Sequence, residues 1–315
     1  MSDSIFLPAL GTILLVLLVT WLYAERGRLL QPSTWKSARA AGLRRIFNLS
    51  ALHAYIFGRW PNQYMHTLIY SVFPRFSETG KRWWADRTHG KVLTHSQASA
   101  IISINKDIAL RDLEHIVPYP IARDLILKGP PDVVVFDCPC RFSREKHCEP
   151  TQVCMVIGQP FAQFTLEHKP HESRKLTQAE ALELLRTEHE QGHFHSAWFK
   201  EIMLNRFCGI CNCCKCCCGG LEAMTRYGIP LMASSGYVAQ IDEDLCNACE
   251  ICVDACAFGA LSTDGVAHLD WNKCMGCGVC VTQCSLEAIS LVRDERKGMP
   301  LDVEAFAHEQ TALGS

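Results

Sequence analysis

The chain has 315 residues, enough for two domains of ordinary size, and its 31 Lys and Arg residues against 33 Asp and Glu residues give a formal net charge of −2. This balance lacks the overall positive potential typical of nucleic-acid-binding proteins, so we exclude DNA and RNA as expected partners. The chain contains 19 cysteines, all at or after Cys138, and therefore divides into a cysteine-free half and a cysteine-rich half.

The first predicted element is a transmembrane anchor over residues 1–24. Ile5–Tyr23 is uncharged and rich in Leu, Val and Ile, and as a helix it spans about 28 Å, close to the thickness of the bilayer core. A cleavable signal peptide is the alternative, but the start carries no positive residue and the end carries no small-residue cleavage site. Basic residues follow at Arg26, Arg28, Lys36, Arg39, Arg44 and Arg45. Because such residues stay on the cytoplasmic side, we predict a single-pass protein of the inner (cytoplasmic) membrane with the bulk of the chain in the cytoplasm.

We expect residues 25–130 to form a helical juxtamembrane region. Residues 43–76 are apolar and aromatic, with breaks at Pro61 and Pro74. This pattern is typical of an interfacial hairpin lying on the bilayer, or of ordinary core helices. The Pro130-Pro131 pair marks the boundary to the next part of the chain.

A cysteine-rich metal-binding module is predicted over residues 131–235. The β-branched and aromatic run Val133–Phe136 predicts a buried strand that ends at Cys138. The candidate ligands are Cys138, Cys140, Cys148 and Cys154 in one group, and Cys208, Cys211, Cys213, Cys214, Cys216, Cys217 and Cys218 in a second group. Seven thiols this close in sequence cannot pair with their neighbours as disulfides without severe strain, so metal ligation is the better interpretation.

The kind of metal centre in this module stays open. The Cys140-Arg141 pair and residues 208–214 resemble uncharacterised membrane-associated iron–sulfur proteins, in which such a module precedes a ferredoxin domain, and this resemblance implies no particular activity. One or two further iron–sulfur clusters are the first interpretation, with a structural zinc site or reactive, partly unligated thiols as alternatives. His193 and His195 are spaced to supply an imidazole ligand, although a capping or solvent-facing role is commoner for such residues. Between the two groups, Thr177 and Glu180 form a capping box that predicts the start of a helix.

Residues 236–293 repeat one cysteine spacing twice. The spacing x2, x2, x3 that begins at Cys246 recurs 28 residues later, beginning at Cys274. Two-residue gaps let successive thiolates surround one inorganic core, while the fourth thiolate points to the other core. This segment resembles the bacterial two-cluster ferredoxin family. The resemblance implies two [4Fe–4S] clusters, one held by Cys246, Cys249, Cys252 and Cys284 and the other by Cys274, Cys277, Cys280 and Cys256. Two zinc sites built from the same eight cysteines are the alternative.

The two halves of this repeat predict clusters of different potential. Glu250 and Asp254 lie between the ligands of the first half, whereas Gly276 and Gly278 lie between those of the second. Fixed negative charge disfavours the reduced state and backbone N–H donors favour it, so we expect the lower potential at the Cys246 cluster, unless both acids are screened by water.

These segments predict an α+β protein with five parts: a single transmembrane helix (1–24), the helical juxtamembrane region (25–130), the metal module (131–235), a dicluster ferredoxin fold (236–293) and a tail (294–315). We interpret the chain as a membrane-anchored, cytoplasm-facing electron-transfer subunit that relays electrons between a low-potential soluble donor and a membrane redox partner. Alternatives are an oxidoreductase whose Cys138–Cys218 module holds a catalytic cluster, and a redox or metal sensor. The sequence carries no Gly-x-Gly-x-x-Gly or Walker motif, so no nucleotide cofactor is expected.

Overall fold

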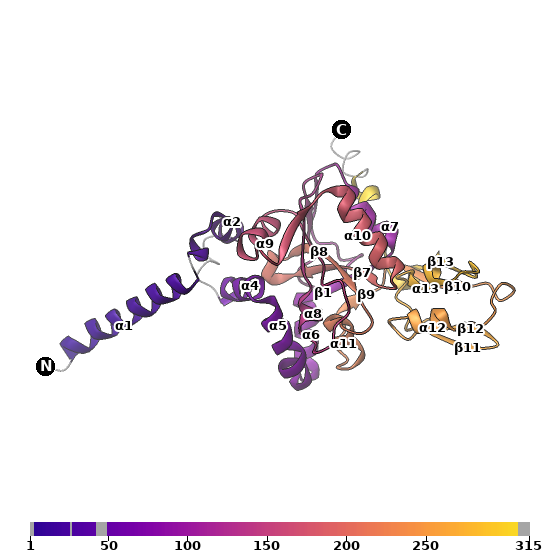
Figure 1. The fold of residues 1–315 in the computed structure, drawn as a ribbon, viewed down its shortest axis with the longest axis horizontal. Coiled ribbons are helices and arrows are strands. Elements are labelled where there is room, and N and C mark those ends of the chain that lie inside the picture. Colours follow the sequence, from indigo (N-terminus) through magenta and orange to yellow (C-terminus); the bar gives the residue numbers. More distant parts are fainter. Residues whose placement is uncertain (1–2, 26, 42–48, 308–315) are drawn as a thin grey trace.

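Figure 1 shows the computed structural model, which describes residues 3–25, 27–41 and 49–307. The chain begins with helix α1 (Asp3–Ala24), which extends away from the other elements. A sheet with helices around it forms the body of the molecule, and the two-fold cysteine repeat forms a separate lobe at one end of it (Figure 1).

The predicted transmembrane anchor is not supported by these described residues. Although α1 covers the uncharged stretch, the described ranges contain no helix with both the length and the apolar character needed to cross a bilayer. The prediction relied on the length of Ile5–Tyr23 and on its uncharged, Leu-, Val- and Ile-rich character, but that range also contains Pro8, Gly11 and Thr12. The predicted single-pass, inner-membrane location rested on the same helix and is corrected with it.

A seven-stranded sheet organises the body, in the order β6-β4-β5-β8-β7-β1-β9. Its strands are β1 (Thr88–Leu93), β4 (Val133–Asp137), β5 (Gln152–Ile157), β6 (Ser173–Leu176), β7 (Phe194–Lys200), β8 (Arg206–Cys213) and β9 (Met232–Ala233). Neighbouring strands are antiparallel, except that β1 and β9 are parallel. The predicted strand before Cys138 is confirmed as β4, and its valines are buried because the sheet is covered by helices and loops.

Close approach of two strands requires a glycine in β8. A Cβ atom at Gly209 would overlap the carbonyl oxygen of Met155 on the adjacent strand β5. This close approach places the cysteines of β8 beside Cys154, which lies in β5. The two cysteine groups that are separate in the sequence therefore lie together in the fold.

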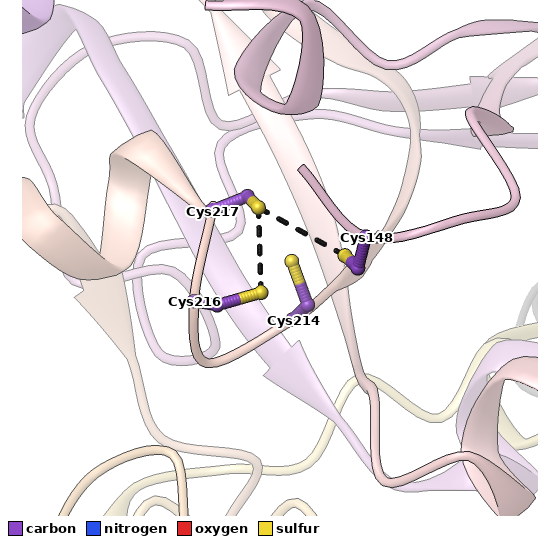
Figure 2. Close-up of side chains that lie close together, drawn as sticks. All are labelled: Cys148, Cys214, Cys216 and Cys217. Carbon is purple, nitrogen blue, oxygen red and sulfur yellow. Dashed lines mark hydrogen bonds between the residues drawn. The ribbon is translucent and has the colours of Figure 1, made fainter. Parts of the chain in front are cut away.

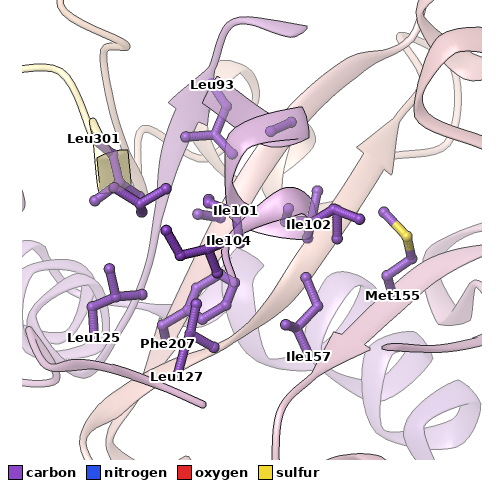
Figure 3. Close-up of a cluster of buried hydrophobic side chains, with 14 of the residues drawn as sticks. Leu93, Ile101, Ile102, Ile104, Leu125, Leu127, Met155, Ile157, Phe207 and Leu301 are labelled. Atoms are coloured by element: carbon purple, nitrogen blue, oxygen red, sulfur yellow. The ribbon is translucent and has the colours of Figure 1, made fainter. Parts of the chain in front are cut away.

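Helices α7 (His95–Ser103) and α10 (Gln178–Glu190) pack side by side against the sheet (Figure 1). The predicted capping box is confirmed at the start of α10, where the Thr177 hydroxyl accepts from the Glu180 N–H and the Glu180 carboxylate accepts from the Thr177 N–H. Buried side chains of both helices and of the sheet form the main hydrophobic core, part of which is drawn in Figure 3.

The region predicted to be helical, residues 25–130, also contains strands. Its helices are α2 (Pro32–Ala41), α4 (Leu49–Arg59), α5 (Pro61–Thr67) and α6 (Glu78–Arg87), with short helical turns at Arg28–Leu30, Leu68–Val72 and Phe73–Arg75. The prediction was wrong for β1, which pairs with β7 inside the central sheet, and for the hairpin of β2 (Ile108–Leu110) and β3 (Leu125–Leu127). The reason is long-range pairing, since β1 is stabilised by a strand about a hundred residues later in the chain.

The core-helix interpretation of residues 43–76 agrees with the burial of the later part. Ile69 and Phe73 are buried in a hydrophobic cluster with Leu221 and Met232. The beginning of that range, together with Arg26, Arg44 and Arg45, lies outside the described residues.

The remaining elements connect the body to the lobe. Short helices α8 (Pro139–Phe142), α9 (Phe161–His168) and α11 (Gly219–Thr225) and a turn at Glu201–Met203 belong to the body. The lobe contains the strand pairs β10 (Tyr237–Ile241) with β13 (Ile289–Arg293) and β11 (Leu261–Asp264) with β12 (Val266–Leu269), helices α12 (Ile251–Ala255) and α13 (Val279–Gln283), and a turn at Glu295–Lys297. Hydrogen bonds from Gln97 to the Ser235 carbonyl and from Gln283 to the Glu190 carbonyl join the two parts.

Candidate metal centres

The lobe presents two sets of four cysteines, each around its own small cavity. One cavity is lined by Cys246, Cys249, Cys252 and Cys284, and the other by Cys256, Cys274, Cys277 and Cys280. In each set the fourth thiol comes from the other half of the repeat, which is the crossed arrangement implied by the ferredoxin resemblance. The ligation itself stays a prediction.

The chemistry of these two sets fits an iron–sulfur cofactor. Burial raises the pKa of Cys277 to about 12 and also raises those of Cys280 and Cys252, so isolated thiolates would be costly there without a metal. Backbone N–H groups of Ala260 and Ala267 point at sulfurs of the two sets, at 3.2 Å and 3.4 Å, as donors to cluster ligands do.

The predicted difference in potential between the two clusters stays a prediction. Glu250 and Asp254 are both exposed, and Glu250 accepts a hydrogen bond from the Thr263 hydroxyl at 2.7 Å. Solvent therefore screens the two charges on which the prediction relied.

In the body, eight cysteines line a cavity of about 140 Å³, and six of them, linked to one another through their thiols, are called here the six-cysteine ring. The ring consists of Cys138, Cys140, Cys154, Cys211, Cys213 and Cys218, and Cys208 and Cys214 complete the cysteine lining of the cavity. The first group supplies three of them from the end of β4, from α8 and from β5, and the second supplies three from β8 and from the residue before α11.

Contacts between these thiols link the ring. Hydrogen bonds from Cys140 and Cys154 hold the pKa of Cys138 well below its usual value, and hydrogen bonds from Cys154 and Cys213 do the same for Cys211. The same hydrogen bonds raise the pKa values of the donating thiols, those of Cys140, Cys154 and Cys213. These hydrogen bonds therefore favour the thiolate form of Cys138 and Cys211, the form in which cysteine binds metals.

Four further cysteines form a compact group, shown in Figure 2: Cys148, Cys214, Cys216 and Cys217. Their Sγ atoms all lie within 4.8 Å of one another, with 3.9 Å between Cys148 and Cys217 and 3.3 Å between Cys216 and Cys217. Four sulfurs around one tetrahedral ion with metal–sulfur distances of about 2.3 Å lie about 3.8 Å apart. A cube holds its thiolates farther apart, because four metal atoms lie between them. Among the described residues the lobe's cysteine sets form no such compact group, so this group fits a single ion better than a cube.

Cys208 is left outside both groups. It lines the cavity, but its thiol donates to the Trp198 carbonyl at 3.4 Å, and burial raises its pKa to about 11. It is accordingly a poorer ligand candidate than the other ten cysteines of the module.

Sequence reasoning missed a buried ion pair beside these thiols. The guanidinium of Arg141 and the carboxylate of Glu188 are fully buried, with 3.0 Å between Nη2 and Oε2. Although burial opposes its charge, Glu188 and nearby thiols, including Cys148, hold the pKa of Arg141 above its usual value. The only signal in the sequence is the position of Arg141 directly after Cys140.

The two histidines singled out in the sequence lie in different surroundings. His193 Nδ1 is 2.7 Å from the Glu188 carboxylate, so this ring belongs to the buried ion pair. His195 lies beside His95 and His189, in a group distinct from the compact cysteine group. Nothing in the sequence connects these last two histidines with His195, because they come from separate helices.

We call the cavity lined by Cys246, Cys249, Cys252 and Cys284 the first cavity, and the one lined by Cys256, Cys274, Cys277 and Cys280 the second cavity. The lobe contacts the body beside its second cavity. Cys277, Met275 and Phe258 pack into the same hydrophobic cluster as Cys213 and Cys218 of the six-cysteine ring. The first cavity has exposed residues in its lining, namely Cys249, Ile251 and Leu286, and Leu245 is exposed as well.

Residues 239–262 and 267–290 match the family model described as a 4Fe-4S binding domain. The chain therefore contains a ferredoxin-type 4Fe–4S binding domain at residues 239–290 with two tandem motifs, and this domain indicates an iron–sulfur electron-transfer role. A comparison with curated proteins found no match to the chain.

Proposed function

We propose that this chain is an electron carrier that passes electrons between a low-potential donor and a redox partner protein, through the ferredoxin lobe and a further metal centre in the body. When bound, iron–sulfur clusters supply reversible one-electron oxidation and reduction. The chain's own residues supply the ligands, their spacing and the docking surface.

The observation that carries this proposal is the contact between the two cysteine-bearing parts. Cys277, a predicted ligand of the lobe, shares one hydrophobic cluster with Cys213 and Cys218 of the six-cysteine ring. This direct packing supports a path for electrons from the exposed Cys249 edge of the lobe into the body.

The proposed entry and exit surface is acidic with an apolar centre. Exposed carboxylates of the lobe include Asp242, Glu243, Asp244, Glu250, Asp254, Asp264, Asp270 and Glu287. Leu245, Ile251 and Leu286 are exposed on the same lobe, and Ile251 and Leu286 line the first cavity. Such a surface suits transient docking of a basic partner, since complementary charge raises the encounter rate more than the affinity.

For the body we propose two different metal centres. The six-cysteine ring offers more thiols than a cube requires and surrounds a cavity, which supports a further iron–sulfur cluster. The compact group of Cys148, Cys214, Cys216 and Cys217 supports a single tetrahedral ion that holds the 214–217 loop in place.

Replacing one crossed ligand tests the carrier function. In the full chain, purified anaerobically, Cys284→Ala should lose about four irons and should slow the oxidation of the reduced protein by a basic one-electron acceptor such as oxidised cytochrome c. Cys208→Ala is the matched control, and it should leave both quantities unchanged because Cys208 lies outside both groups. An unchanged rate in Cys284→Ala would contradict the proposed path.

A catalytic role is the second candidate, and the cavity favours it. Besides the cysteines, the cavity is lined by Phe57, Tyr64, Trp84 and Trp198, an aromatic surface that a carrier does not require. Turnover of a small molecule with an artificial reductant, undiminished in Cys284→Ala, would favour this function over the carrier.

A further inference from the structure

Three histidines from different elements meet beside the lobe. His95 begins α7, His189 lies in the last turn of α10 and His195 lies in β7. Their ring centroids are 5.2 Å, 5.2 Å and 5.5 Å apart, and one ring nitrogen of each lies within 4.8 Å of the others. The three rings thus form a nearly equilateral triangle.

One nitrogen in this group is buried without a partner. His195 is fully buried and His189 is 6 % exposed. The Nδ1 atom of His189 is buried and has no hydrogen-bond partner. Since buried polar atoms are normally hydrogen-bonded, this atom requires a ligand that the protein itself does not supply.

The tautomer of His195 follows from its neighbour Asn212. The Asn212 amide nitrogen donates to the Val153 carbonyl at 2.9 Å, which fixes the amide orientation and turns Oδ1 toward His195. His195 Nδ1 lies 2.7 Å from that oxygen and therefore donates to it. The Nε2 atom of His195 is then left without a proton, with its lone pair directed at His95 Nδ1, 3.3 Å away.

These distances match three imidazoles around one tetrahedral ion. With zinc–nitrogen distances of about 2.0–2.1 Å, ligand nitrogens lie about 3.3 Å apart and the ring centroids about 5 Å apart. A hydrogen bond between His95 and His195 would explain the 3.3 Å contact, but it would leave His189 Nδ1 without a partner.

We infer that His95, His189 and His195 form a binding site for one divalent transition-metal ion of the zinc type, with a fourth position open to water or an exchangeable ligand. Asn212 acts as the outer partner that orients His195, as carboxylates and carbonyls do for other metal-bound histidines. The site adjoins the lobe, since the His189 ring lies 4.0 Å from the position of a Cβ at Gly278, the residue after Cys277. A bound cation would therefore place positive charge beside the second cavity.

Metal counting with nitrogen-sensitive spectroscopy tests this site. The full chain, purified anaerobically with its iron bound, is incubated with ZnCl2, freed of unbound metal, and analysed for zinc and iron per chain. We expect the double variant His95→Ala/His189→Ala to hold one zinc fewer than the parent with the same iron content. His171→Ala, at an exposed histidine, is the control and should match the parent. The difference between parent and variant in zinc X-ray absorption should consist of imidazole nitrogen and contain no sulfur.

A single substitution distinguishes loss of the metal site from misfolding of the variant. His95 is the least buried of the three rings, so His95→Ala should keep the parent's circular dichroism and iron content while zinc binding weakens about tenfold or more. Equal zinc content and equal zinc affinity in parent and variants would overturn the inference. So would a zinc difference that consists of sulfur ligands, since it would assign the ion to the compact cysteine group.

Discussion

Arg141 and Glu188 form an ion pair in which both side chains are fully buried, 3.0 Å apart, and thiols of the compact group and of the six-cysteine ring both act on Arg141. Replacing one partner leaves the other charge buried without compensation, which costs about 3–5 kcal/mol. We therefore predict that Arg141→Gln lowers the free energy of unfolding by this amount, measured by urea denaturation of the iron-loaded chain.

The matched control is an exposed ion pair. Arg174 and Glu180 are 2.9 Å apart, but about half of each side chain is exposed. Arg174→Gln should cost about 0–1 kcal/mol, because solvent screens such pairs. Similar losses in the two variants would show that Arg141 is not a structural charge.

Lys91 gives the protein a pH-dependent stability. This side chain is 1 % exposed and donates to the Met299 carbonyl at 2.7 Å, and burial, with a contribution from Arg293, lowers its pKa to about 7. Between this value and the ordinary lysine pKa near 10.5, the unfolded chain binds more protons than the folded chain. Stability from this group therefore rises with pH through that window, by up to about 1.4 kcal/mol per pKa unit.

Lys91→Met isolates this contribution. We expect the variant's gain in stability over the parent to be largest at pH 7 and to shrink as the pH rises to 9.5, in chemical denaturation measured at each pH. A difference between variant and parent that does not change with pH would show that Lys91 stays charged in the folded state.

We predict that replacing Gly276 by alanine destabilises the lobe, because the structure leaves no room for a Cβ atom at this position. Its φ is +65°, and a Cβ there would overlap the Tyr237 carbonyl oxygen. At Gly265, with φ +76°, a Cβ meets no atom within 4 Å. Gly265→Ala should cost only the backbone strain of about 1–2 kcal/mol. Gly276→Ala should lower the stability by more than this and should reduce the iron content. Equal midpoints of thermal denaturation and equal iron contents in the two variants would contradict this prediction.

The acidic surface of the lobe should make electron delivery depend on salt. With a basic acceptor such as oxidised cytochrome c, we expect the rate to fall as ionic strength rises, because the charges are exposed. Glu243→Gln/Asp244→Asn should lower the rate at low salt and flatten its salt dependence, whereas Glu145→Gln, an exposed acid of the body, should do neither. A rate that does not respond to salt would place docking elsewhere.

Local patterns predicted the parts of this protein that depend on nearby residues. The repeated spacing from Cys246 and from Cys274 indicated the 4Fe–4S binding domain, and Thr177 with Glu180 predicted the start of α10, because a ligand loop and a capping box are contained in a few residues. The uncharged, apolar Ile5–Tyr23 stretch was interpreted as a membrane span from its length and composition, and the described residues do not support that interpretation.

Long-range strand pairing determines which cysteines and histidines of the body lie together, and local sequence patterns did not indicate it. We divided the module's cysteines by proximity in the chain, but the pairing of β5 with β8 mixes the groups. Cys148 joins Cys214 in the compact group, while Cys154 joins Cys211 in the ring. His95 reaches His195 only because β1 pairs with β7, a register that no local pattern indicates.

The central claim is that the body holds a further iron–sulfur centre in contact with the ferredoxin lobe. Its most direct test is to measure iron and acid-labile sulfide per chain in the full-length parent and in Cys211→Ala, both purified anaerobically. Electron paramagnetic resonance of the reduced proteins accompanies this measurement. Cys211 belongs to the six-cysteine ring and not to the lobe, so its loss should leave the lobe's ligands intact. The proposal predicts clearly more than the roughly eight irons of two cubes in the parent, and a loss of the excess, with its spectral signal, in Cys211→Ala. About eight irons in both proteins with identical spectra would contradict it.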